Sequence, residues 1–286
     1  MALDIPKRLR AYLEILAFIA VGVWGMPLSP PGQIFLKSSH PHQGAILVLL
    51  EIVTFQKGPK DILNPPKLID RIFGKVWLRI DKMIAAGELE TNLPALINKA
   101  YGTVLEVGPG SGNQLPRYDV AKIDRIYGVE PNPDLHDALR ATIKQHGLSD
   151  VYTIVPCGVE DSAELAHYGI RAGSVDTVTS VQVLCSVPQP AEMARELYRL
   201  LKPGGQMVVY EHVESEDWLS RRVQGLYTTV WPYVTGHCRL NRPTGKYLLE
   251  AGSWSTIELE TPKEEDAWML FPHVSGRLVK WGAGAK

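Results

Sequence analysis

The sequence predicts an α/β fold in which a mostly parallel sheet carries helices on both faces. First, strand-like and helix-like segments alternate through the middle of the 286-residue chain, which is the order that βαβ units produce. Second, one strand-like segment runs directly into the glycine-rich stretch LEVGPGSG at residues 105–112. Third, the last two strand-like segments are joined by a loop alone, as in an antiparallel pair.

The first element of this region is predicted to be an amphipathic helix over residues 66–89. Pro66 stands near its start and Gly87 near its end, which is typical of helix boundaries. Its apolar face is predicted from aliphatic residues that recur at every fourth position, namely Leu68, Ile72, Val76 and Ile80.

Alternating elements follow this helix. Apolar segments typical of strands lie at residues 103–108, 125–130, 151–156, 175–181 and 206–212. Helices are predicted between them at residues 133–147 and 190–205, and the second one places Met193, Leu197, Leu200 and Leu201 on one face. Residues 255–261 and 276–281 are predicted to form the final antiparallel pair of strands.

The composition excludes several classes of function. The chain carries 30 Lys and Arg against 31 Asp and Glu, for a net charge of −1, and has no basic tract of the kind that binds nucleic acid. A nucleic-acid partner is therefore not expected. Cys157, Cys185 and Cys238 lie far apart, outside any CxxC spacing. They predict neither a disulfide framework nor a metal site, and a reducing compartment suits them best.

The N-terminus is unusually apolar. Three cations in PKRLR precede a largely apolar run at residues 11–27, and a second apolar run covers residues 44–55. Each run contains one acid, Glu14 or Glu51, and the Pro- and Ser-rich segment between the runs is predicted to be a loop.

Three interpretations of this segment compete. It could be a cleaved signal peptide, although no clean cleavage site follows. It could also be a helical cap packed on the soluble domain. We favour a membrane anchor or an interfacial helix pair, with lipid contacts from residues 11–55 and the catalytic domain on the cytosolic side. The expected domains are thus an apolar segment at residues 1–60 and a folded domain at residues 61–286, with an insertion at 214–250 as a substrate cap.

Gly108, Gly110 and Gly112 are predicted to bring backbone close to a ligand. Each glycine costs a strand or helix roughly 0.5–1 kcal/mol relative to alanine, so a contact that needs a bare backbone should offset that cost. A glycine-rich turn between a strand and a helix provides such a contact at the helix N-terminus. The dinucleotide-binding fingerprint G-x-G-x-x-G would have its third glycine at residue 113. This chain has Asn113 there, so it does not match that fingerprint. Glu130 closes the second strand, and a carboxylate there can accept hydrogen bonds from both ribose hydroxyls of a nucleoside. Nicotinamide enzymes also have an acid at that place, so Glu130 alone does not specify the class of enzyme.

Four motifs taken in order resemble those of class I S-adenosylmethionine-dependent methyltransferases. LEVGPGSG resembles their first motif and YGVEPNP their acidic second motif, while GSVDTVTSVQVLCSV and ELYRLLKPGGQMVVYEH resemble their fourth and fifth strand regions. The resemblance implies a Rossmann-like sheet of seven strands with the last strand antiparallel, here with an apolar helical N-terminal extension. Pro109 departs from the common pattern and has no N–H, so amide contacts in the loop must come from Gly110 or later.

A narrower resemblance covers most of the chain from about residue 100. The segments VLCSV, LKPGG, EHV, CRLNR and PHVSG are similar to those of the microsomal alkyl thiol methyltransferases, whose apolar N-terminus anchors them to membranes. This likeness implies a membrane-associated enzyme, on the endoplasmic reticulum or lipid droplets if eukaryotic. It is weaker over the first hundred residues, where only the apolar character matches.

The resemblance implies S-adenosylmethionine as the cofactor and assigns its contacts. The glycine loop would approach the amino acid and ribose parts, Glu130 the ribose, residues 158–160 the adenine, and the end of the fourth strand the methionyl part. The expected cofactor-binding residues are Glu106, Gly108, Gly110, Ser111, Gly112, Glu130, Pro131, Asn132, Gly158, Val159, Glu160, Ser180 and Gln182.

Several of these residues have a plain structural alternative. Gly112 could serve only to let a helix pack against a strand. Glu160 could be an acid at a helix N-terminus, since Asp161 and Ser162 beside it suit a cap. Cys185 is expected to be a small packing residue rather than a nucleophile.

Methyl transfer from a sulfonium requires the acceptor in line with the S–CH3 bond, and a base if the acceptor is protonated. His212 is the preferred candidate base because it follows the fifth strand, with His237 a weaker candidate and His273 a third. A histidine that only bonds a loop is an equally good interpretation of His212.

The aromatic residues of the 214–250 insertion have two interpretations. Trp218, Tyr227, Trp231 and Tyr233 could roof an apolar acceptor or form core for two helices.

We therefore expect methyl transfer from S-adenosylmethionine to a thiol or hydroxyl of a lipophilic small molecule. The alternatives are a quinone, sterol-like or natural-product O- or C-methyltransferase, and a non-catalytic protein with this fold that binds at a lipid surface. An intact glycine loop together with Glu130 argues against the last of these.

Overall fold

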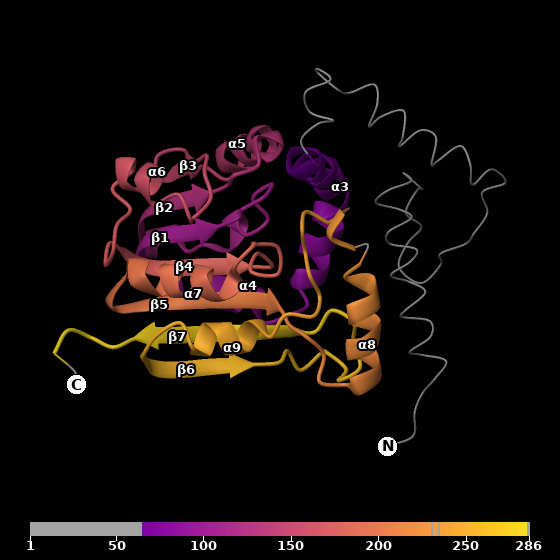
Figure 1. The fold of residues 1–286 in the computed structure, drawn as a ribbon. Coiled ribbons are helices and arrows are strands. Elements are labelled where there is room, and N and C mark those ends of the chain that lie inside the picture. Colours follow the sequence, from indigo (N-terminus) through magenta and orange to yellow (C-terminus); the bar gives the residue numbers. More distant parts are fainter. Residues whose placement is uncertain (1–64, 230, 234, 285–286) are drawn as a thin grey trace.

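The computed structural model describes residues 65–229, 231–233 and 235–284, and within them seven strands form one sheet (Figure 1). The strand order is β3-β2-β1-β4-β5-β7-β6. The strands are β1 (Gly102–Val107), β2 (Ile123–Val129), β3 (Tyr152–Val155), β4 (Val175–Val181), β5 (Leu201–His212), β6 (Trp254–Glu260) and β7 (His273–Lys280).

The first five strands pair in parallel, and β7 runs antiparallel to both β5 and β6. This confirms the predicted seven-stranded sheet with its antiparallel last strand. β5 begins five residues before the predicted 206, because the segment from Leu201 also pairs with β4 across an irregular register.

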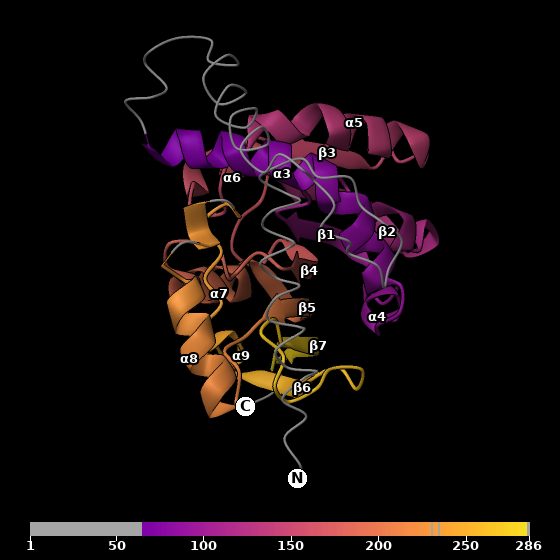
Figure 2. The same cartoon turned by 90° about the vertical axis from the view of Figure 1, so that its right-hand side faces the viewer.

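The sheet has an apolar core on each face. The helices are α3 (Pro65–Glu88), α4 (Leu93–Ile97), α5 (His136–Gln145), α6 (Ser162–His167), α7 (Pro190–Leu200), α8 (Trp218–Tyr227) and α9 (Thr244–Leu249). Buried residues of α6, α7 and α9 form one core with the sheet, and those of α4 and α5 form the other. Figure 2 shows these two groups of helices on opposite sides of the strands.

The parallel strands place the loops that follow them at one edge of the sheet. The carboxyl ends of adjacent parallel strands are where ligands bind in doubly wound folds. The loops after β1, β2, β3 and β4 all leave this edge, and α3 lies across it (Figure 1). The candidate site is therefore bounded by strand ends on one side and by α3 on the other.

The expectations for residues 1–60, including the lipid contacts of residues 11–55, lie outside the described residues. Within the part of the chain that the structure describes, no helix combines the length and apolar character needed to cross a membrane.

Candidate functional site

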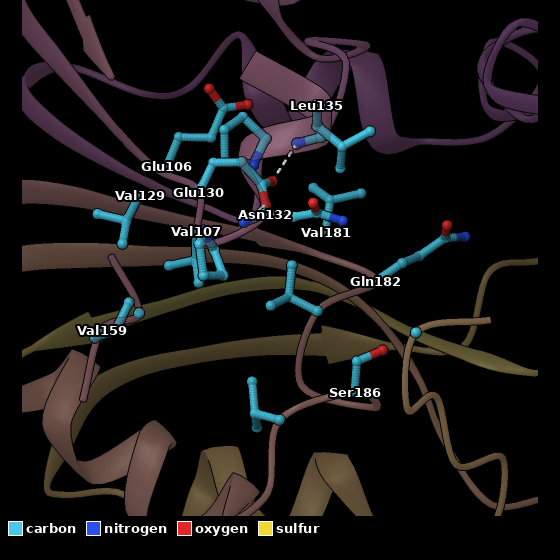
Figure 3. A pocket seen from close by; sticks show the side chains of 18 of the residues that line it. Glu106, Val107, Val129, Glu130, Asn132, Leu135, Val159, Val181, Gln182 and Ser186 are labelled. Atoms are coloured by element: carbon cyan, nitrogen blue, oxygen red, sulfur yellow. Dashed lines mark hydrogen bonds between the residues drawn. The ribbon is translucent and has the colours of Figure 1, made fainter. Parts of the chain in front are cut away.

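A cavity of about 350 Å³ opens at the carboxyl edge of the sheet. Figure 3 shows side chains such as Glu130, Val159 and Gln182, which follow three different strands, around this one pocket. Most of the residues expected to bind the cofactor line it, namely Glu106, Gly108, Gly110, Glu130, Pro131, Asn132, Gly158, Val159, Glu160 and Gln182. Ser111, Gly112 and Ser180 are not among its lining residues.

The glycine loop needs glycine for two different reasons. Gly108, Gly110 and Gly112 have φ angles of +56°, +60° and +92°, a region that side chains with a Cβ rarely adopt. A Cβ on Gly110 would stand 2.8 Å from Nε1 of Trp77. A Cβ on Gly112 would meet Thr142 and Leu139 of α5, so this glycine permits loop packing against that helix. The first two glycines allow the loop to lie close to two side chains of the cavity wall, Val183 beside Gly108 and Trp77 beside Gly110.

Glu130 ties the glycine loop to the segment after β2. The side chain is 4% exposed. Its Oε2 accepts a hydrogen bond from the backbone N–H of Gly110 (2.9 Å) and its Oε1 one from the N–H of Asn132 (2.9 Å). Burial raises the pKa of the carboxyl, and the two amide bonds oppose that shift. Each carboxylate oxygen keeps a further lone pair for a ligand hydroxyl.

Glu106 lines the cavity and has a buried carboxyl group. The residue is 2% exposed, and its Oε2 accepts a hydrogen bond from the Tyr152 hydroxyl (2.7 Å). Its Oε1 is buried and has no partner at hydrogen-bond distance and angle among the described residues. The nearby Tyr118 hydroxyl shares a hydrogen bond with Thr179 Oγ1 (2.8 Å), in which either hydroxyl can be the donor. Burial raises the pKa of the Glu106 carboxyl to about 7, and the hydroxyls of Tyr152 and Tyr118 oppose that shift. A buried acceptor without a partner is costly, so a ligand donor at this position would remove that cost.

The segment after β3 could use Glu160 either at the N-terminus of a helix or as a ligand contact, and the structure favours the second role. Asp161 is the N-cap of α6, where its side chain accepts a hydrogen bond from the N–H of Glu164 (3.0 Å). Glu160 instead lines the cavity with Gly158 and Val159. Because Asp161 caps the helix, Glu160 remains available to a ligand.

At the end of β4, strand alternation selects the side chains that face the cavity. Thr179 and Val181 line it, whereas the hydroxyl of Ser180, between them, donates to Glu211 Oε1 (2.7 Å). Successive side chains of a strand point to opposite faces, so Thr179 and Val181 face the cavity and Ser180 faces away from it. Gln182 lines the cavity with a positive φ of 57° and bonds Nε2 of His273 (3.1 Å).

Helix α3 supplies a wall that the sequence did not indicate. Asp70, Phe73 and Trp77 line the cavity from this helix. Trp77 Nε1 donates to Ser111 Oγ (3.2 Å), and the backbone carbonyl of Asp70 accepts from the side-chain amide of Asn132 (2.8 Å). These bonds hold α3 on the glycine loop and on the loop after β2. The sequence indicated that this helix is amphipathic, with Leu68, Ile72, Val76 and Ile80 on its apolar face. It did not indicate that Asp70, Phe73 and Trp77 line a cavity.

The two histidines proposed as bases lie in different surroundings. His212 is not among the lining residues; its Nδ1 lies 3.8 Å from the Cys238 sulfur, and its ring lies against those of Phe271 and His273. His237 does line the cavity, and its Nε2 lies 3.3 Å from Asp70 Oδ1 of α3. The structure thus reverses their order as candidates. His273 has both ring nitrogens engaged, by Gln182 and Glu265.

The insertion at 214–250 reaches the cavity through Gly236 and His237. None of the four aromatic side chains proposed to roof an acceptor, Trp218, Tyr227, Trp231 and Tyr233, is among the described lining residues. Trp231 is buried against Cys185, Cys238 and Leu240. Trp218 and Tyr233 are 68% and 60% exposed. The aromatic side chains on the cavity come from α3 instead.

Comparison with known sequences identifies similar enzymes. A family model described as a methyltransferase domain matches residues 105–209. The thiol S-methyltransferase TMT1B of Rattus norvegicus is 30% identical over 181 residues, which cover 62% of this chain and 70% of that protein. The thiol S-methyltransferase TMT1A of Homo sapiens is 31% identical over 181 residues with the same two coverages.

Comparison with solved structures supports the fold. An O-methyltransferase family protein from Burkholderia thailandensis gives a TM-score of 0.55 at 16% identity, over 96% of this chain and 85% of that chain. The N-methyltransferase NodS from Bradyrhizobium japonicum, in complex with S-adenosyl-l-homocysteine, gives a TM-score of 0.53 at 16% identity, over 76% and 98% of the two chains.

Proposed function

Since this chain belongs to the thiol S-methyltransferase family of S-adenosylmethionine-dependent methyltransferases, we propose that it methylates the sulfur of a lipophilic thiol. The observation that carries the proposal is the meeting of three groups in one cavity: the carboxyl groups of Glu106 and Glu130 and the imidazole of His237. In this proposal Glu106 binds the ammonium group of the donor, Glu130 binds its ribose, and His237 removes the proton of the acceptor.

We assign the cofactor contacts to residues whose chemistry suits each part of S-adenosylmethionine. Glu106 Oε1 accepts from the α-ammonium group, which supplies the missing partner of this buried oxygen. Glu130 accepts from the ribose hydroxyls with its remaining lone pairs. Val159 and Leu135, which line the cavity, provide apolar contacts for the adenine, and Gly108 and Gly110 leave room for the chain between these parts.

His237 is the base in this proposal. The bound cofactor supplies an activated methyl group on a sulfonium, so the residues need only hold the acceptor in line and remove one proton. His237 accepts the proton of the thiol, and Asp70, 3.3 Å from its Nε2, orients the ring and stabilises the imidazolium. The sulfur lone pair then forms the new S–CH3 bond as the sulfonium C–S bond breaks.

A lipophilic acceptor suits the surroundings of the cavity. Phe73, Trp77 and Val187 contribute apolar surface to its wall. Trp218, Leu226 and Tyr233 are large and exposed on α8 and the 3-10 turn Trp231–Tyr233, close in sequence to His237. We propose that this surface, as part of a substrate cap at 214–250, faces lipid together with the apolar residues 11–55.

The test is methyl transfer by the full chain in detergent micelles to thiols and alcohols of matched chain length. We expect thiols to be methylated and kcat/KM to rise with chain length, and we expect His237→Gln to lower kcat more than it changes donor binding. Asp137→Asn, on the exposed face of α5, is the control and should leave both unchanged. Methylation of the alcohols but not of the thiols would contradict the assignment of the acceptor atom.

A further inference from the structure

Two cysteines and a histidine far apart in the sequence meet beside the cavity. Cys185 lies in the loop after β4, His212 ends β5, and Cys238 belongs to the 214–250 insertion. Both cysteines are free thiols and buried, at 1% and 5% exposure. The third cysteine, Cys157, lies in a different core cluster.

The ligand atoms of the three residues have the spacing of a metal site. The Cys185 sulfur, the Cys238 sulfur and one ring nitrogen of His212 all lie within 4.8 Å of one another. The Cys238 sulfur is 3.8 Å from Nδ1 of His212. With metal–ligand distances of about 2.3 Å for sulfur and about 2.0 Å for nitrogen, a tetrahedral zinc site separates these atoms by about 3.5–3.8 Å.

The surroundings hold the three residues in place. The backbone N–H of Arg239 donates to the carbonyl of Cys185 (2.8 Å), which joins the two cysteine segments. Arg242 donates to the carbonyls of Leu184 (2.7 Å) and Val187 (2.6 Å), on either side of Cys185. The His212 ring lies 4.6 Å from that of His273 and 5.6 Å from that of Phe271. Outer contacts of this kind fix ligand geometry in metal sites.

We propose that Cys185, His212 and Cys238 bind one zinc ion. Two thiolates and a neutral imidazole are soft and borderline ligands that favour Zn²⁺ over Mg²⁺ or Ca²⁺. Binding releases the two thiol protons to solvent, and two thiolates balance the two charges of the ion, so the filled site is neutral and suits burial.

The site would fasten the 214–250 insertion to the sheet. His212 comes from a strand and Cys238 from the insertion, directly after His237 of the cavity wall. Three protein ligands leave one tetrahedral position open, and among the described residues no fourth His, Cys, Asp or Glu completes the group. Assignment of His212 to zinc also removes it as a base, independently of which acceptor the enzyme uses.

The first measurement is the zinc content of the full chain, expressed with zinc and purified in detergent without chelators. We expect one equivalent of zinc in the parent protein and in the control Cys157→Ser, and less than a tenth of an equivalent in Cys185→Ser, Cys238→Ser and His212→Gln. Zinc retained by all three ligand variants would overturn the proposal.

A second measurement needs no variant, in case these three proteins do not fold. Cobalt added to the metal-free parent protein should produce the near-ultraviolet charge-transfer band of thiolate–cobalt bonds, and an organomercurial should release stoichiometric zinc from the zinc form. Absence of the band, with Cys185 and Cys238 recovered as free thiols or joined in a disulfide, would overturn the proposal.

Discussion

Replacement of Glu130 by Gln should weaken donor binding and also loosen the glycine loop. The carboxylate is 4% exposed and accepts amide hydrogen bonds from Gly110 and Asn132 at 2.9 Å each. The amide side chain keeps one acceptor oxygen and places an NH2 group opposite one backbone N–H. One loop amide therefore loses its partner, and the ribose hydroxyls lose a charged acceptor.

The expected magnitudes follow from these contacts. Loss of hydrogen bonds to a charged group costs about 1.5–3 kcal/mol, which corresponds to an increase of roughly 10- to 150-fold in the Kd for S-adenosylmethionine. The unpaired amide should lower the free energy of unfolding of the ligand-free protein by about 1–3 kcal/mol. The two backbone hydrogen bonds thus give Glu130 a part in the stability of the fold in addition to its proposed ribose contact.

Isothermal titration calorimetry with S-adenosylmethionine measures the affinity, and chemical denaturation of the ligand-free protein measures the stability. Asp137→Asn is the control, because Asp137 forms only an exposed ion pair with Arg140 on α5. If Glu130→Gln binds as tightly as the parent protein, the assignment of the ribose contact to Glu130 is wrong. If only stability falls, the carboxylate has a structural role alone.

Three further predictions concern the loop, the pH dependence and the membrane. Gly110→Val should abolish donor binding in calorimetry, because a Cβ there would lie 2.8 Å from Trp77 Nε1 at a φ of +60°; normal activity of a folded variant would show that the loop has a packing role only. Burial raises the pKa of Glu106 to about 7, so its carboxyl is increasingly protonated below that pH, and donor affinity should fall by up to about tenfold per unit as the pH decreases from 7 to 5. Glu106→Gln should bind weakly with a flat profile, and an equally steep profile in this variant would place the titrating group elsewhere. The full chain should float with liposomes whereas a chain beginning at residue 61 should not, and a full chain that stays monomeric and does not float without detergent would make residues 11–55 a cap on the domain.

The sequence predicted the sheet well because its strands are buried and apolar. All seven strands lie within a few residues of their predicted positions, and the largest difference is at the start of β5, which begins at Leu201 instead of 206. The short helices α4, α6 and α9, each of five or six residues, were not predicted, because so few residues carry no helical period. Loops that follow parallel strands must meet at one edge, so most of the residues expected to bind the cofactor line one cavity, and their roles there stay a prediction.

What the sequence did not reveal depends on long-range packing. The contacts of Trp77 with the glycine loop and of Asp70 with His237 join segments separated by 34 and by 167 residues, and no local pattern specifies either. Cys185, His212 and Cys238 have no metal-binding spacing in the sequence, so their meeting depends on how the insertion docks on β5. The sequence also did not show the strand parity at Ser180, whose side chain bonds Glu211 while its neighbours Thr179 and Val181 line the cavity.

The most direct test of the central claim follows the methyl group itself. The full chain is incubated with methyl-labelled S-adenosylmethionine and a long-chain alkane thiol, and the products are identified by mass spectrometry. We predict a labelled methyl thioether formed in equal amount to S-adenosylhomocysteine, and loss of both products in Gly110→Val. S-adenosylhomocysteine formed without a methylated sulfur, or no turnover by a protein that binds the donor, would contradict thiol methylation as the function of this cavity.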